Sequence, residues 1–145
     1  MTKSEQARWL GEKIDEWRHS VATLTGVLRQ HPQTVYTGLQ KSLQQEWSFV
    51  QCVAPGVGMV FQAVEDDLLD TFLQALFQGD TSHIPGRTIT GLPNKKSGIA
   101  FPDPPHTVGA NWTASYVITG HLVSALCRTD KFSSEDYALV IEEGR

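Results

Sequence analysis

The chain is poor in cysteine, in charged residues and in long apolar runs. Its two cysteines, Cys52 and Cys127, are too few for a disulfide scaffold and too isolated for a zinc site, so a reducing compartment is expected. No run of about 18 apolar residues is present to span a membrane, and the first residues are polar and charged where a signal peptide is apolar. We therefore expect an intracellular protein, in the cytoplasm or the nucleus, with no signal peptide, no transmembrane segment and no membrane partner.

Basic residues are also scarce, and this limits the classes of partner. The net charge is −4, whereas domains whose whole surface binds nucleic acid are strongly basic. Between Asp80 and Asp103, however, the charged residues are Arg87, Lys95 and Lys96, all of them positive. A locally positive segment points to an anionic partner. We therefore predict Arg87, Lys95 and Lys96 as nucleic-acid-binding residues.

Apolar residues recur with a helical period in most of the first half of the chain. The first helix is expected from Ser4, a suitable N-cap, to the residues before Pro32, and two more helices fit about 32–51 and 59–77. The expected inner faces are Leu10, Ile14, Trp17, Val21, Leu24 and Leu28, then Val35, Tyr36, Leu39, Leu43, Trp47 and Val50, and finally Phe61, Val64, Leu68, Phe72 and Leu76. Stripes of this kind predict that the three helices pack together.

Residues 78–106 interrupt the helical pattern. Prolines at 93, 102, 104 and 105 remove backbone donors and disfavour helix before them, and Gly98 turns freely. A short strand at 87–90 fits this segment. A fourth helix is expected at about 107–127, and a short last helix follows Ser133. The expected inner face of the fourth helix is Ala110, Ala114, Val117, Ile118, Leu122, Ala125 and Leu126.

These patterns predict an all-α protein, a bundle of four to five helices interrupted by one long loop that contains proline and glycine. The chain is expected to form a single helical domain over 1–145. Its helical parts are placed at 4–79 and 107–145, and its irregular segment at 80–106.

Residue patterns that would indicate catalysis are missing. Glu65, Asp66 and Asp67 superficially look like the paired aspartates that hold metal ions in polymerases. Neighbouring residues on a helix point about 100° apart, so Asp66 and Asp67 are expected on a solvated acidic face instead. The histidines have no metal-ligand spacing, and no nucleophile or phosphate loop is recognisable. Trp17 and Trp47 fall on core stripes. We predict no catalytic residue, no metal site and no cofactor.

Several short blocks occur together in an order that is more informative than any one of them. The blocks are Tyr36, Gly38, Leu39, Ser42, Leu43, Glu46, Trp47 and Phe49; Pro55 to Val57; Leu73 and Ala75 to Phe77; Leu92, Pro93, Lys95, Gly98, Ile99 and Pro102 to Pro104; Asn111, Trp112, Ala114 and Ser115; and Gly120 to Val123. In this order, the sequence from about residue 17 to 145 resembles the region downstream of the palm in certain eukaryotic retrotransposon reverse transcriptases. The block at 92–104 is the most specific part of this resemblance.

The resemblance implies a thumb-like or connecting region that packs on a polymerase core and contacts a primer–template duplex. The palm, with its metal-binding aspartates, has no counterpart in this sequence, so the chain is expected not to be an enzyme. Two functions therefore remain open. The first is a non-catalytic, reverse-transcriptase-like fragment that contacts an RNA or DNA duplex weakly through Arg87, Lys95 and Lys96. The second is a helical protein–protein interaction module, whose partner is another protein or a second copy in a homodimer.

Overall fold

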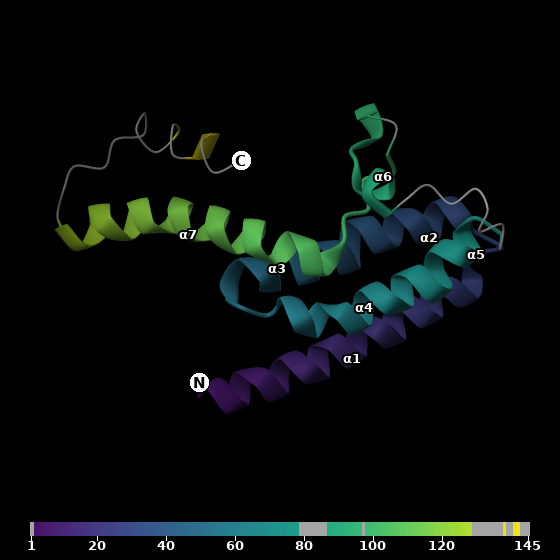
Figure 1. Cartoon of the computed structure of the whole chain (residues 1–145), viewed down its shortest axis with the longest axis horizontal. Coiled ribbons are helices and arrows are strands. Elements are labelled where there is room, and N and C mark those ends of the chain that lie inside the picture. Colours follow the sequence, from purple (N-terminus) through teal and green to yellow (C-terminus); the bar gives the residue numbers. More distant parts are fainter. Residues whose placement is uncertain (1, 79–86, 97, 129–137, 139–140, 143–145) are drawn as a thin grey trace.

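The computed structural model describes residues 2–78, 87–96, 98–128, 138 and 141–142, and these residues form an all-α fold without strands, as predicted. The described elements are the α-helices α1 (Lys3–Val27), α2 (Pro32–Gly38), α3 (Gln44–Val53), α4 (Gln62–Asp67), α5 (Gln74–Leu76), α6 (Arg87–Gly91) and α7 (Pro104–Arg128), the π-helical turns η1 (Leu39–Leu43) and η3 (Leu68–Leu73), and the 3₁₀ turns η2 (Gly58–Phe61) and η5 (Asn94–Lys96). Three helical rods, α1, α2–η1–α3 and η2–α4–η3–α5, pack together, and α7 crosses one end of them (Figure 1).

The first helix starts earlier than predicted, with Thr2 as its N-cap in place of Ser4. The Thr2 hydroxyl accepts a hydrogen bond from the Glu5 backbone N–H at 3.3 Å, and the Glu5 carboxylate accepts one from the Thr2 backbone N–H at 2.7 Å. This reciprocal pair is a capping box. The predicted inner face is buried except for Leu24, which is partly buried against the core.

The second and third rods each contain a π-helical turn, and the spacing of their apolar residues explains why. Leu39, Leu43 and Trp47 are separated by four residues each, and so are Val64, Leu68 and Phe72. In a regular helix of 3.6 residues per turn, two such steps drift by about 80° around the axis. A π turn winds more slowly and cancels this drift. All six side chains are buried as a result.

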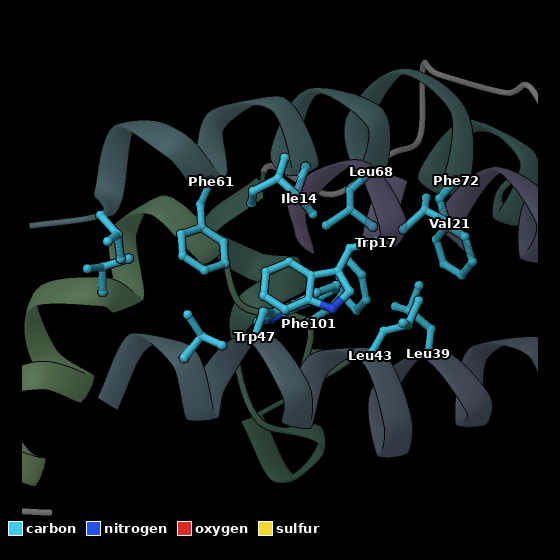
Figure 2. Close-up of a cluster of buried hydrophobic side chains, with 14 of the residues drawn as sticks. Ile14, Trp17, Val21, Leu39, Leu43, Trp47, Phe61, Leu68, Phe72 and Phe101 are labelled. Carbon is cyan, nitrogen blue, oxygen red and sulfur yellow. The ribbon is translucent and has the colours of Figure 1, made fainter. Parts of the chain in front are cut away.

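Trp17 lies at the centre of the core. Its indole ring stacks on Phe61 at 5.7 Å and meets Trp47 edge to face at 6.3 Å. Figure 2 shows these three side chains converging from different rods. The indole N–H donates to the Glu46 carboxylate at 3.0 Å, so the polar atom of the buried ring is satisfied. The core predicted for the first three helices is confirmed.

The inner face predicted for the fourth helix is confirmed only in part. Only the first turns of α7 pack on the bundle, against α3, η2 and α4, and Val108 is buried there. The rest of the helix extends past the bundle end (Figure 1). Of the predicted face, Ala110, Val117 and Leu126 are exposed, and Ala114, Ile118, Leu122 and Ala125 are only partly buried. The sequence pattern showed an apolar helix correctly, but it could not show where the neighbouring helices end.

The predicted irregular segment contains more helix than expected. Residues 87–90, suggested as a strand, belong to α6, and Pro104, counted in the irregular segment, begins α7. A proline in the first helical turn costs no hydrogen bond, and the Asp103 carboxylate caps that turn by accepting from the His106 backbone N–H at 3.2 Å. The predicted last helix after Ser133 falls almost wholly outside the described residues.

Candidate functional site

Arg87 connects the predicted nucleic-acid-binding segment to the bundle core. A guanidinium has five N–H donors. Two of them bind the Glu65 carboxylate, with Nε to Oε1 at 2.5 Å and Nη2 to Oε2 at 2.9 Å. Two more bind the backbone carbonyls of Phe101 and Pro102, and the fifth binds the Thr90 hydroxyl at 2.9 Å. All five donors therefore have partners inside the protein.

Both members of this ion pair lie in the interior. The side chain of Glu65 is 4% exposed and that of Arg87 is 17% exposed. Burial raises the pKa of the Glu65 carboxyl above its ordinary value, although the hydrogen bonds from Arg87 act in the opposite direction. The guanidinium also lies 5.3 Å from the ring centre of Phe101, which in turn stacks on Phe72 at 5.9 Å.

A second set of contacts holds the same segment from the other side. The Tyr36 hydroxyl donates to the Ile99 carbonyl, and the Gln40 side chain donates to the Ala100 carbonyl at 3.3 Å. Ala100 adopts a φ of 53°, which residues other than glycine rarely adopt. Gly98 is required by space: a Cβ there would overlap the Leu92 carbonyl and lie 2.6 Å from its Cβ. The described part of the segment is therefore fixed against the bundle.

The three predicted nucleic-acid-binding residues thus occupy two environments. Arg87 is enclosed by its partners, and it could reach a phosphate only by leaving them. Lys95 and Lys96 are exposed on η5, in the segment that stands out from the bundle (Figure 1). The structure leaves the two lysines as the accessible part of the predicted site.

The acidic residues of α4 are not the uniformly solvated face that was predicted. Glu65 is buried, and Asp67 accepts two hydrogen bonds from Arg18 of α1, the shorter at 2.7 Å. Asp66 is exposed, as expected, and accepts from Gln62 at 2.9 Å. Within the described ranges, no group of three or more histidine, cysteine or acidic side chains could hold a metal ion. Asp67 therefore connects α4 to α1, and Glu65 connects α4 to α6.

Gln51 holds α7 on the bundle. Its side chain is fully buried, with Nε2 donating to the Pro104 carbonyl at 2.8 Å. Its Oε1 accepts from the Thr107 hydroxyl at 3.0 Å and from the Asn111 amide at 2.6 Å. One side chain thereby binds the first two turns of α7. Sequence reasoning missed the role of Gln51 and the burial of Glu65, because a single polar residue on a helix carries no signal of its distant partner.

Large apolar side chains gather on the exposed surface where α7 leaves the bundle. On α7 itself, Tyr116 is 65% exposed, Val123 55% and Leu126 80%. These three side chains lie on one face of the helix, within about 80° of one another around its axis. We call these three residues the apolar end surface. Clustered apolar side chains at a surface mark sites of interaction.

Comparison with protein-family profiles, with curated proteins and with solved structures finds no match for this chain. None of the helices that the structure describes combines the length and the apolar character needed to cross a bilayer.

Proposed function

We propose that this chain is a non-catalytic helical interaction module that binds a protein partner through the apolar end surface. The observation that carries the proposal is the exposure of the distal half of α7, where Tyr116, Val123 and Leu126 face solvent. Each such side chain gains about 1.5–3 kcal/mol when it moves from water into an apolar contact. A partner that covers the surface gains this for several side chains at once.

The charge pattern of α7 supports the same proposal. Residues 104–127 contain no aspartate, glutamate, lysine or arginine. A solvent-exposed helix usually carries charge on the face away from the core, whereas a helix that is apolar or uncharged all round is normally covered. The polymerase core that the resemblance implies is one class of partner that fits, because a connecting region of that kind packs on its neighbour. We expect no templated nucleotide incorporation by the purified chain with magnesium or manganese.

Site-specific photo-crosslinking tests the proposal by trapping whatever protein covers the surface. The photoreactive residue p-benzoylphenylalanine replaces Tyr116 or Val123, and the chain is produced in cells of the organism that encodes it. We expect protein adducts from both positions. The same residue at the exposed positions Glu12 and Asp70 serves as the control and should give none. Equal adducts from all four positions, or none from Tyr116 and Val123, would overturn the proposal.

A second candidate function is weak contact with nucleic acid through Lys95 and Lys96, which is favoured by their exposure on η5. Two phosphate contacts predict that log K falls with log salt with a slope of about −1.8 on duplex, whereas three contacts would give about −2.7. Labelled duplex is titrated at three salt concentrations. Lys95→Ala with Lys96→Ala should abolish binding, and the charge-matched pair Lys3→Ala with Lys41→Ala should not. Equal binding by both double variants would remove this candidate.

A further inference from the structure

We propose that α7 carries an intramolecular docking surface, and that the end of the same chain, residues 129–142, folds back along the helix to cover it. The surface consists of Ile118, His121, Leu122 and Ala125, which we call the distal stripe. It lies on a different side of α7 from the apolar end surface, so it goes beyond the interaction module and does not depend on it.

The distal half of α7 is shielded from solvent on one side only. Over residues 116–127 the distal stripe is partly buried, whereas the other residues are exposed apart from Gly120, which has no side chain. Leu126 is 80% exposed, but Leu122, about one turn before it, is partly buried. A helix without a neighbour is exposed all round, so another part of the chain lies against the distal stripe.

The bundle is too far away to provide this shielding. Asn111 of α7 donates to Gln51 of α3, and Leu122 lies 11 residues farther along the helix, about 16 Å. Figure 1 shows the distal half of α7 extending past the ends of the rods. The element that covers the distal stripe therefore comes from elsewhere in the chain.

The end of the chain is itself partly buried and lies at the required level. Ala138, Ile141 and Glu142 are helical; Ile141 is partly buried, while Ala138 and Glu142 are exposed. In Figure 1 the short yellow piece at 141–142 lies level with the middle of α7 and not beyond its far end. Partial burial of an isoleucine so close to the end of a chain indicates that it packs on another element.

The length and the apolar pattern of the segment fit the distal stripe. A helix from the predicted N-cap Ser133 to Ile141 is about 12 Å long, which equals the length of α7 from Ile118 to Leu126. Tyr137, Val140 and Ile141 have the spacing of one helical face. Residues 129–132 suffice for the turn between two antiparallel helices.

The charges of the segment favour the same arrangement. At 100° per residue, Glu135, Asp136, Glu142 and Glu143 all lie about 90° or more from the centre of the apolar face. Contact through that face therefore buries no charge against α7, which has no acidic residue, lysine or arginine from 104 to 127. The short connection to Arg128 keeps the effective concentration of the segment high, so a small contact is enough to hold it.

Covering the distal stripe leaves the apolar end surface open. The centres of the two surfaces lie about 140° apart around the helix. The end of the chain thus acts as a brace that keeps the distal half of α7 helical, while Tyr116, Val123 and Leu126 stay exposed for a partner.

Hydrogen exchange of the full chain, followed by mass spectrometry, tests the brace. We expect residues 116–127 to be protected in the parent chain and to exchange at least about tenfold faster in Ile141→Asp, because a carboxylate cannot pack on the distal stripe. Ala138→Asp is the matched control: it adds the same charge at an exposed site of the same segment and should change nothing. Exchange in α3 should be the same in all three proteins. An unprotected distal half in the parent chain, or equal exchange in the two variants, would overturn the proposal.

A double-mutant comparison tests whether Ile141 acts through the distal stripe. Leu122→Asp should speed exchange of the distal half as Ile141→Asp does, and the two changes together should add little more, because both break one contact. Val123→Asp, on the exposed side, combined with Ile141→Asp should give independent effects. Independent effects of Leu122→Asp and Ile141→Asp would place Ile141 against another surface and reject the brace.

Dilution tests whether the brace belongs to the same chain. Protection of residues 116–127 should not change over a 100-fold range of chain concentration, whereas loss of protection on dilution would assign the cover to a second copy and overturn the proposal. Photo-crosslinking from Tyr116 and Val123 tests the interaction module separately. A captured protein without an effect of Ile141→Asp rejects the brace alone, and an effect of Ile141→Asp without a captured protein rejects the interaction module alone.

Discussion

The guanidinium of Arg87 joins its own helix, α6, to two other segments: it binds Thr90 within α6, Glu65 of α4, and the carbonyls of Phe101 and Pro102 in the chain before α7. Removing the guanidinium leaves a buried carboxylate and two carbonyl oxygens without their donors. We expect Arg87→Ala to lower the free energy of unfolding by roughly 3–5 kcal/mol, the usual range for breaking a buried pair. Urea unfolding followed by circular dichroism measures this loss.

Arg87→Lys should recover little of the loss, because one ammonium cannot reproduce five donors in a planar fork. The exposed Lys96→Ala is a control for loss of positive charge in the same segment, and it should change stability by less than about 0.5 kcal/mol. An Arg87→Ala protein as stable as the Lys96→Ala protein would show that the ion pair contributes nothing to stability.

The buried carboxyl of Glu65 should give the protein an unusual dependence on pH. Burial raises its pKa above 4.5, Asp103 and Asp66 act in the same direction, and Arg87 opposes them. Between 4.5 and the raised pKa, the folded chain binds more protons at this site than the unfolded chain. The contribution of Glu65 to stability therefore falls as the pH rises through this window, and it is constant above it.

Glu65→Gln provides the reference for this prediction, because glutamine keeps the acceptor for Arg87 and does not titrate. Unfolding in urea is measured for both proteins at several pH values from 4 to 7. The parent chain should lose stability relative to the variant as the pH rises from about 4.5. A difference that stays constant across the range would contradict a raised pKa for Glu65.

The sequence could not reveal the role of Arg87, although it identified the residue. Arg87 was grouped with Lys95 and Lys96 because all three lie in a stretch without acidic residues. Glu65 was grouped with Asp66 and Asp67 because the three are adjacent. The ion pair joins residues 22 positions apart across a tertiary contact, and neither local charge nor helical period records such a contact.

At the scale of an element, α7 depends on Gln51 for its attachment. We expect Gln51→Met, which keeps the length of the side chain, to lower stability by about 1–3 kcal/mol, because the Pro104 carbonyl and two side-chain donors lose their partner inside the protein. Hydrogen exchange should show the largest loss of protection in the first turns of α7. Gln45→Met, at an exposed site on the same helix, should have little effect. Unchanged exchange in α7 would mean that its attachment does not depend on Gln51.

The helical rods and α7 show what the period of apolar residues can predict. The stripes at 32–51 and 59–77 located both helical rods and their buried faces, and the structure confirms them. The two π turns were not predicted, although Leu39, Leu43 and Trp47 repeat every four residues, a spacing that drifts by about 80° around a regular helix and that a π turn brings back into line. For α7 the stripe identified a helix but not its environment, because the position of the bundle end is a property of the whole fold.

For the whole molecule, the stability of the three rods depends on the aromatic centre around Trp17. Its ring contacts Phe61 and Trp47, and its N–H binds Glu46, so one side chain joins α1 to the other two rods. Trp17→Ala should lower the free energy of unfolding by roughly 3–5 kcal/mol, which combines lost burial with the cavity left behind. The loss should appear in one cooperative transition that includes α7, since Gln51 and the segment around Arg87 tie α7 to the same core.

Trp9 offers a matched control on the same helix. It is also a tryptophan of α1, but it is 39% exposed and lies two turns before Trp17. Trp9→Ala should therefore cost much less than Trp17→Ala, and the difference isolates the effect of position in the core from the loss of an indole ring. Thermal unfolding of the two variants and the parent, followed at 222 nm, makes the comparison. Equal losses of stability in the two variants would show that Trp17 contributes no more to the core than Trp9 does. A separate early transition for α7 in Trp17→Ala would show that α7 and the rods do not unfold as one unit.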